Sequence, residues 1–315
     1  MQRPPLSIMV TGANGFLGAR LCTEILSHKL GLIRVTRDNT DNGAVVVGDI
    51  CTQTDWIPAL SSRPDVVVHL AARVHVLKLD TRVSQDYYDR VNVEGTELLA
   101  RQCALHGVKR FIFVSTIKVN GDRTLKGIPF TTAHPPDAQD PYAISKLRAE
   151  RVLQKIAEET GMELVIIRPP LIYGPGVKGN FALMMRWLCK GVPLPLLDFS
   201  DNLRSFVSLE NMTDLLIRCL THPGALGPPL LVSDDYDLST VELISKIGSF
   251  AGKRVRLFRV PKNVLKTLAD FFGKTDMYYR LSDSLQVDIE QTKKRLSWKP
   301  PCSFDVGLRS MVDSM

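Results

Sequence analysis

Two side chains spaced one helical turn apart could exchange a proton with a substrate. Tyr142 and Lys146 lie in the stretch Asp140-Pro141-Tyr142-Ala143-Ile144-Ser145-Lys146, and a four-residue spacing places both on one face of a helix. A free phenol has a pKa of about 10 and exchanges protons poorly at neutral pH. Because a lysine ammonium stabilises a phenolate, the spacing predicts a lowered pKa of Tyr142 and general acid–base chemistry. The same spacing is also typical of a solvated helix face, so the elements around the pair must decide between the catalytic and the structural interpretation.

A glycine-rich turn near the N-terminus supplies that context. Gly12, Gly15 and Gly18 follow an apolar segment at 7–11 and open a helical pattern at 16–28. Gly12 allows a tight turn, Gly15 lets the backbone approach a diphosphate, and Gly18 lets helix and strand pack closely. The spacing is G-x-x-G-x-x-G rather than the common G-x-G-x-x-G, and a plain turn is the alternative. The strand–turn–helix order nevertheless predicts dinucleotide binding. The loop residues expected at the cofactor are Gly12, Asn14, Gly15, Phe16, Leu17 and Gly18.

Strand and helix patterns alternate through the first half of the chain. This alternation predicts a doubly wound, Rossmann-like parallel sheet of the α/β class, with ligand at the carboxyl ends of the strands. Strands are expected at 7–11, 32–36, 44–47, 66–70, 111–115 and 164–168, and helices near 16–28, 85–106 and 142–160. Prolines and glycines cluster after Arg168, which predicts a smaller, mostly helical C-terminal substrate lobe. The expected division is 1–171 plus about 206–224 for the dinucleotide-binding domain, and 172–205 plus 225–315 for the lobe.

Composition bounds the class of protein. The chain has 315 residues, 44% of them hydrophobic, with a formal net charge of +7 and a mean hydropathy near zero. No apolar run approaches the ~20 residues of a membrane-spanning helix, and because the expected first strand begins within a few residues of Met1, no signal peptide is expected. The six cysteines form no C-x-x-C pair and no metal-ligand cluster, which predicts a reduced, cytoplasmic protein without a metal. Dispersed basic residues suit an anionic ligand such as a nucleotide and argue against nucleic-acid binding.

An apolar stripe near the C-terminus has two interpretations. It consists of Val264, Leu265, Leu268, Ala269, Phe271 and Phe272, beside several lysines. A helix at the membrane surface is one interpretation, and packing within the lobe is the favoured one.

Four motifs in order resemble the extended short-chain dehydrogenase/reductase family, in the branch that acts on nucleotide sugars. They are TGANGFLG at 11–18, HLAA at 69–72, YAISK at 142–146 and RPPLIYGPG at 168–176. The resemblance runs from about residue 6 to about residue 300. It is specific for the superfamily and much less so for the substrate. It implies a UDP-sugar substrate, and by analogy a homodimer formed through the helices at 85–106 and 142–160.

The resemblance also locates the cofactor site. NAD-using relatives carry an acidic residue at the end of the second strand, and the corresponding position here is Thr36, followed by Arg37. Arg37 can bind a 2′-phosphate, which favours NADPH. Asp38 is the alternative alignment and would restore NAD, and Arg37 as an ordinary exposed residue is a further alternative. The other expected cofactor contacts are Asp49 and Ile50 after the third strand, Leu70, Ala71 and Ala72 after the fourth, Pro169, and the Tyr142–Lys146 pair. The alternatives are that Asp49 only caps a turn and that Ala71 and Ala72 only allow tight packing.

By resemblance, three side chains carry the chemistry. Thr116 hydrogen-bonds the reacting sugar oxygen, Tyr142 gives or takes the proton, and Lys146 binds the nicotinamide ribose. A hydroxyl at a strand end also satisfies backbone groups in many proteins, which is the alternative for Thr116. Sugar-nucleotide 4,6-dehydratases carry Asp-Glu directly after this threonine, where this chain has Ile117 and Lys118. The dehydratase reaction is therefore not expected. Asn120 replaces a tyrosine found in many relatives, with a consequence that the sequence does not give.

Substrate-binding residues are expected in the lobe as well as at Thr116 and Tyr142. Arg204 matches a family position that often binds the nucleotide diphosphate, with a surface ion pair as the alternative. Asn180 and Phe181 are expected to line the nucleotide pocket, although Phe181 could equally be core. Leu171 stands where many epimerases and dehydratases have an asparagine that holds the diphosphate.

These features favour NADPH-dependent reduction of a UDP-linked 4-keto-6-deoxy-hexosamine, as in the synthesis of surface-polysaccharide precursors. The alternative is a UDP-hexose or UDP-N-acetylhexosamine 4-epimerase that keeps NAD tightly bound. A ketone reductase for apolar substrates is less favoured. A non-catalytic NADP sensor of the same fold is also less favoured, because such proteins typically lose the tyrosine or the lysine and this chain keeps both Tyr142 and Lys146.

Overall fold

The computed structural model describes residues 5–39, 41, 43–74, 84–177, 184–185, 187–188 and 191–314, with only the backbone of Asp276. Asn180 and Phe181, two of the expected substrate-binding residues, lie outside the described residues. No helix in the described part is long and apolar enough to cross a membrane.

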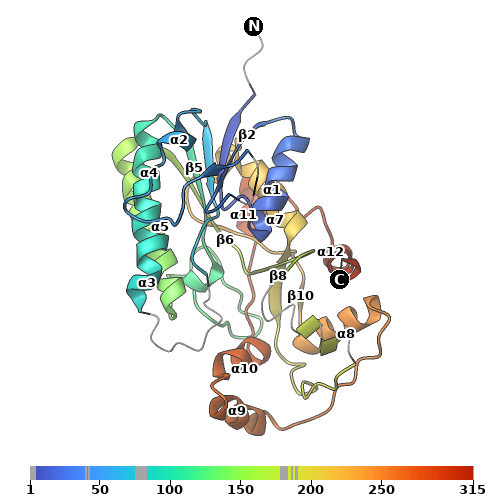
Figure 1. The fold of residues 1–315 in the computed structure, drawn as a ribbon. Helices are drawn as coiled ribbons and strands as arrows, with labels where there is room; N and C mark the ends of the chain where they lie inside the picture. Colours follow the sequence, from blue (N-terminus) through green and yellow to red (C-terminus); the bar gives the residue numbers. More distant parts are fainter. Residues whose placement is uncertain are drawn as a thin grey trace.

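A seven-stranded sheet forms the centre of the protein, in the order β3-β2-β1-β4-β5-β6-β9 (Figure 1). All of its strand pairs are parallel. Its strands are β1 (Ser7–Thr11), β2 (Gly31–Thr36), β3 (Val45–Val46), β4 (Val66–His69), β5 (Arg110–Val114), β6 (Glu163–Arg168) and β9 (Leu230–Leu231). The sheet confirms the predicted Rossmann-like α/β class, and six of the seven strands lie within two residues of their predicted bounds.

Helices cover both faces of this sheet, because successive side chains of each strand point to opposite sides. Ile8 and Val10 of β1 pack into one buried cluster with α1 (Phe16–Ser27) and α7 (Leu209–Cys219). Met9, between them, packs into a second cluster with α4 (Thr96–Leu105) and α5 (Pro141–Thr160). The short helix α2 (Ile57–Leu60) closes the second face. Figure 1 shows α3, α4 and α5 on one side of the sheet and α1, α7 and α11 on the other.

The helix expected over 85–106 is interrupted. It consists of α3 (Gln85–Asp89), a π-helical segment η1 (Arg90–Gly95) and α4. The π segment contains Asn92, which is buried and bonds to groups outside the helix (below). Gly95 packs so closely on the third-strand loop that an added Cβ would lie 2.4 Å from Ile50 Cγ2.

A smaller sheet, β10-β8-β7, begins the lobe. Its strands are β7 (Leu171–Tyr173), β8 (Arg204–Ser208) and β10 (Asp237–Leu238), and its helices are α8 (Thr240–Phe250), α9 (Lys262–Phe271), α10 (Thr275–Ser282) and α12 (Phe304–Asp313). A third cluster of buried side chains, including Phe199, Phe206, Leu243 and Leu308, forms its core. The 3₁₀ turns η2 (Ile117–Val119) and η3 (Pro223–Ala225) complete the assignment.

Part of the C-terminal region, which the sequence analysis assigned to the lobe, packs on the large sheet. β9 pairs with β6 in the large sheet, and α11 (Glu290–Leu296) covers that sheet. Leu231, Ile289 and Trp298 belong to the same buried cluster as β1 and α1. Strand β9 has only two residues and therefore too short a pattern to be recognised in the sequence.

Candidate active site

The glycine turn forms a cradle at the N-terminus of α1. Gly12 has a left-handed backbone (φ +67), and an added Cβ would lie 3.0 Å from the nitrogen of Ala71. A Cβ on Gly18 would lie only 2.1 Å from the oxygen of Gly12. No side chain caps the N-terminus of α1, and its first turn has no acidic residue. Backbone N–H groups and the helix dipole therefore face the loop without an internal anion, an arrangement that fits a dinucleotide diphosphate.

Acidic and basic side chains meet beside this cradle at the end of β2. Asn14 donates a hydrogen bond of 3.4 Å from Nδ2 to Oδ1 of Asp38, so Asp38 lies next to the glycine turn. Arg37 is 69% exposed, and its guanidinium lies 3.9 Å from Asp38 and 4.0 Å from Asp49. Thr36 is buried, and its hydroxyl donates to the backbone oxygen of Asp38. Of the two alternatives weighed from the sequence, Asp38 is the residue in contact with the loop.

A buried histidine ties the end of β4 to this region. Thr11 Oγ1 lies 2.7 Å from His69 Nδ1, and His69 Nε2 lies 3.0 Å from Thr96 Oγ1. Thr11 Oγ1 also accepts a hydrogen bond from the backbone N–H of Ala71. Burial, together with the charge of Lys146, lowers the pKa of His69 to about 3. The neutral imidazole therefore positions the Leu70–Ala72 segment rather than exchanging protons.

Tyr142 and Lys146 lie on α5, as the spacing predicts. The helix begins at Pro141 after Asp140, whose side chain caps it by accepting from the N–H of Ala143. Lys146 is buried, with its Nζ 3.9 Å from the centroid of the Phe113 ring. The ring of Tyr142 lies edge-on to Tyr88, with 6.3 Å between centroids.

The electrostatics of this pair differ from the sequence prediction. The pKa of Tyr142 lies above its usual value, not below it, because burial and then the charges of Asp140 and Tyr88 disfavour the phenolate. Burial also lowers the pKa of Lys146 to about 7, against the opposing effect of Glu150. Lys146 is thus only partly charged at neutral pH, which weakens the stabilisation expected from a full ammonium.

Thr116 lies at the end of β5, where its backbone begins η2 and its hydroxyl accepts from the N–H of Lys118. Lys118 forms an ion pair with Asp140 and a second, of 2.8 Å, with Asp122. This pairing joins the turn that holds Thr116 to the N-terminus of the helix that holds Tyr142. Ile117 is buried, so neither position resembles the acid and base of a dehydratase.

The role of Asn120 becomes clear in the structure. Arg168 Nη1 donates a 3.0 Å hydrogen bond to Asn120 Oδ1, and its other nitrogens bind both carboxylate oxygens of Glu150. All three residues are buried. Because Glu150 follows Lys146 by one turn of α5, Asn120 completes a network that fixes the carboxylate acting on Lys146.

Asn92 is a positioning residue that the sequence analysis missed. Its side chain accepts from the N–H of Arg73 and donates to the oxygen of Arg73 and to Ser145 Oγ. It therefore holds the segment after β4 against α5, beside Lys146. The run Val-Asn-Val-Glu-Gly-Thr at 91–96 was the available signal, since a buried asparagine must find partners outside its helix.

Arg204 lies apart from these residues, at the start of β8. Its Nη1 donates to the backbone oxygen of Asp283 at 2.9 Å. Burial, and the nearby charge of Arg280, lower its pKa to about 10, against the charge of Asp283. Arg204 therefore remains charged at neutral pH, so this region can bind an anion. The segment after η2 contacts the chain next to Asp283, because the N–H of Thr124 donates to the oxygen of Ser284.

Two further residues that the sequence analysis singled out lie near β6. The oxygen of Pro169 accepts from the N–H of Ile117, so it lies against the Thr116 turn. Leu171, in β7, is 44% exposed.

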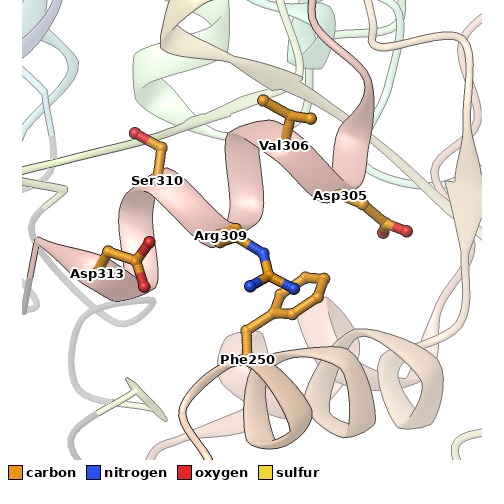
Figure 2. Close-up of a pocket in the computed structure, with 6 residues that line it drawn as sticks. All are labelled: Phe250, Asp305, Val306, Arg309, Ser310 and Asp313. Carbon is orange, nitrogen blue, oxygen red and sulfur yellow. The ribbon is translucent and has the colours of Figure 1, made fainter.

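Figure 2 shows a separate pocket between α8 and α12, where the Arg309 guanidinium lies over the Phe250 ring. Among the predicted site residues that the structure describes, none lines that pocket.

Residues 8–232 match the model of the NAD dependent epimerase/dehydratase family. That segment covers well over half of the chain and includes both the glycine turn and the Tyr142–Lys146 pair. The chain belongs to this family. Members of the family are NAD-dependent enzymes that act on sugar nucleotides, and the resemblance found in the sequence is confirmed.

Relatives within the epimerase/dehydratase family include a UDP-glucose 4-epimerase of Vibrio cholerae. It is 41% identical over 99% of this chain and 96% of its own. The fold is shared with a UDP-glucose 4-epimerase of Thermotoga maritima bound to UDP-glucose (TM-score 0.78, 21% identity, 98% of both chains). A UDP-glucuronic acid 4-epimerase of Bacillus cereus in complex with NAD is equally similar (TM-score 0.78, 22% identity, 98% of this chain and 96% of that one).

Proposed function

We propose that the protein interconverts the C4 epimers of a UDP-hexose or UDP-N-acetylhexosamine with NAD as cofactor. The observation that carries the proposal is the 41% identity to the Vibrio cholerae UDP-glucose 4-epimerase over nearly the whole of both chains. This choice reverses the preference for a ketoreductase that the sequence motifs alone suggested.

The side chains of the candidate site supply the proton chemistry that such a reaction needs. The dinucleotide, when bound, contributes hydride transfer at C4 of the sugar. Tyr142 removes the proton of the C4 hydroxyl and later returns it to the same oxygen, while the Thr116 hydroxyl holds that oxygen in place. Because burial raises the pKa of Tyr142, its phenol must lose a proton before it can act as a base. A positively charged Lys146 at the nicotinamide ribose favours that loss.

We infer NAD rather than NADP from the end of β2. Asp38 contacts Asn14 of the glycine turn, so its carboxylate can accept hydrogen bonds from the two hydroxyls of the adenosine ribose. A 2′-phosphate in the same place would meet this negative charge. Arg37 extends toward solvent between Asp38 and Asp49, where both carboxylates compete for its guanidinium.

The diphosphate of the substrate is assigned to the arginine pair of the lobe. Burial, and the charge of the nearby Arg280, lower the pKa of Arg204, so the two guanidinium groups lie in the same region. Two guanidinium groups in one region can bind a diphosphate through charge-assisted hydrogen bonds. Asp283, which forms an ion pair of 3.6 Å with Arg123, also lies in this region.

A second candidate is NADPH-dependent reduction of a UDP-linked 4-keto-6-deoxy-hexosamine. Two observations favour it. Burial and Asp140 keep Tyr142 protonated, which is the state that a proton donor to a keto oxygen requires. In addition, the exposed guanidinium of Arg37 is free to turn toward a 2′-phosphate, because its two ion pairs are long.

One set of measurements separates these candidates. The purified protein is denatured and any released nucleotide is identified; the native protein is then incubated with UDP-glucose and with UDP-N-acetylglucosamine. A 4-epimerase releases NAD and forms the C4 epimer without net change in nicotinamide absorbance. A protein that purifies without nucleotide, forms no epimer and consumes one NADPH for each UDP-4-keto sugar would establish the reductase instead. The Tyr142→Phe variant serves as the control for both reactions.

A further inference from the structure

Helix α9 exposes an apolar stripe on the surface of the lobe. None of its residues is buried. Val264 and Leu268 are each 48% exposed, Phe271 is 81% exposed, and Phe272, directly after the helix, is 65% exposed. Their positions i, i+4, i+7 and i+8 place them on one face. The favoured expectation of packing within the lobe holds only for Leu265, which contacts the lobe core.

The helix is nevertheless held in place. Leu265 anchors one edge, and α9 packs beside α10, as Figure 1 shows at one end of the molecule. The two exposed phenylalanine rings contact each other edge-on, with 5.2 Å between their centroids. The stripe is therefore a fixed surface feature, with its apolar side turned away from the protein.

Much of the net positive charge of the chain lies in this helix and in the segment that leads into it. Residues 253–274 contain seven lysines and arginines and one aspartate, whereas the net charge of all 315 residues is +7. Three of these cations form ion pairs, Arg259 with Asp198, Lys262 with Asp201 and Lys266 with Asp270. The remaining cations, Lys253, Arg254, Arg256 and Lys274, are exposed and form no ion pair with any side chain that the structure describes.

We propose that α9 and its flanking basic residues dock the protein onto an anionic phospholipid surface. An amphipathic helix with aromatic side chains on one face and lysines beside them is typical of proteins that lie in the headgroup region of a bilayer. The phenylalanines enter the acyl boundary, while the lysine stems extend back to the lipid phosphates. The docking does not depend on the reaction that the active site performs.

The composition of the surface favours a lipid over a protein partner. Protein interfaces are depleted in lysine and bury about 800 Å² on each partner. Four side chains in a single stripe are a small area by that standard, and the segments on either side of the helix carry cations that form no ion pair with any side chain that the structure describes. A lipid surface instead supplies both an apolar layer and a high density of negative charge.

The full-length protein can be tested by co-sedimentation with vesicles of phosphatidylcholine alone and of phosphatidylcholine mixed with phosphatidylglycerol. We expect binding only to the mixed vesicles, decreasing as salt is added. Phe271→Ser combined with Phe272→Ser should weaken it by at least ~10-fold. Arg254→Glu combined with Arg256→Glu should weaken it by a similar factor. Leu105→Ser and Lys155→Glu, at exposed positions on the sheet domain, are matched controls that should leave binding unchanged.

Circular dichroism and sedimentation velocity of each variant complete the experiment. Absence of binding to the mixed vesicles, or equal binding by the phenylalanine double variant, would overturn the proposal. So would a change in oligomeric state on replacing the phenylalanines, since the stripe would then be an interface between copies of the chain.

Discussion

Replacing Lys146 with methionine should stabilise the cofactor-free protein at neutral pH while it removes a residue of the candidate active site. Lys146 is 2% exposed, and the contact that its ammonium makes is with the face of the Phe113 ring. Glu150, one turn further along α5, gives both carboxylate oxygens to Arg168 instead. A methionine has a similar unbranched stem and buries no charge.

The sign and size of the effect follow from the pKa. Burial lowers the pKa of Lys146 from 10.5 to about 7. As the pH falls through this interval, the unfolded chain binds a proton that the folded protein does not, so folding becomes less favourable. The cost reaches about 5 kcal/mol below pH 7 and is about 3 kcal/mol near pH 8, as upper estimates. The exchange of one unbranched side chain for another in the packed interior costs up to ~1.5 kcal/mol. We therefore expect Lys146→Met to gain about 1–2 kcal/mol near pH 8 and nothing near pH 10.5.

Urea unfolding of nucleotide-stripped wild type and Lys146→Met, between pH 7 and pH 10, measures this difference. Lys155→Met is the matched control, because Lys155 is an exposed lysine of the same helix. A Lys146→Met protein that is no more stable than wild type near pH 8 would refute the reasoning. A gain that does not shrink as the pH rises would do the same, since the cause would not be the buried charge.

Three other predictions concern single side chains. Tyr142→Phe should lower turnover by ~10²-fold or more with unchanged folding and nucleotide binding, and a near-normal rate would contradict its role in proton transfer. In fluorescence titrations, Asp38→Ala should weaken NADH binding far more than Arg37→Ala does, and Arg37→Asp should weaken NADPH binding more than NADH binding. If a variant changes the binding of both nucleotides equally, the residue that it replaces does not contact the adenosine ribose. His69→Asn should reduce the loss of folding stability in acid. Because the pKa of His69 is about 3 in the folded protein and higher in the unfolded chain, the wild type loses about 2 kcal/mol of stability between pH 6.5 and pH 5, and the variant lacks this loss. Parallel urea-unfolding curves of His69→Asn and wild type across that range would contradict the prediction.

The parts of the fold that the sequence predicted are those with local signals. Strands β1 and β5 are apolar runs next to glycine or charged turns, and α5 has a complete start signal in Asp140-Pro141. The glycine turn was recognisable because each glycine has a separate steric reason to be there. These features depend on residues within about one strand and one helix of each other, so no knowledge of the tertiary structure was needed.

Contacts between distant segments were not predictable in this way. Asn92 bonds to Arg73 and to Ser145, which lie 19 and 53 positions away in the chain. A helical pattern over 85–106 says nothing of these partners, and the π-helical segment that presents Asn92 has no periodic signature. Asn120 likewise had no interpretation until Arg168, 48 positions away, was seen to donate to it.

The pKa of Tyr142 shows why sequence spacing alone misjudged the electrostatics. Spacing identified Lys146 as the dominant charge, because a residue four positions away must lie nearby on a helix. It could not show that the same packing that brings the two together also partly buries Tyr142 and fully buries Lys146, which raises the pKa of the phenol and lowers that of the amine. Nor could it show that the helix cap Asp140 faces the phenol, or that Lys118 arrives from a different element to pair with this carboxylate. The protonation of Tyr142 is therefore set by three elements rather than one. Since Lys118 stands where a dehydratase has an acidic residue, a carboxylate there would add a second negative charge beside Asp140 and oppose the phenolate further. The lysine at this position thus stands in place of the dehydratase base and pairs with Asp140, one of the two charges that raise the pKa of Tyr142.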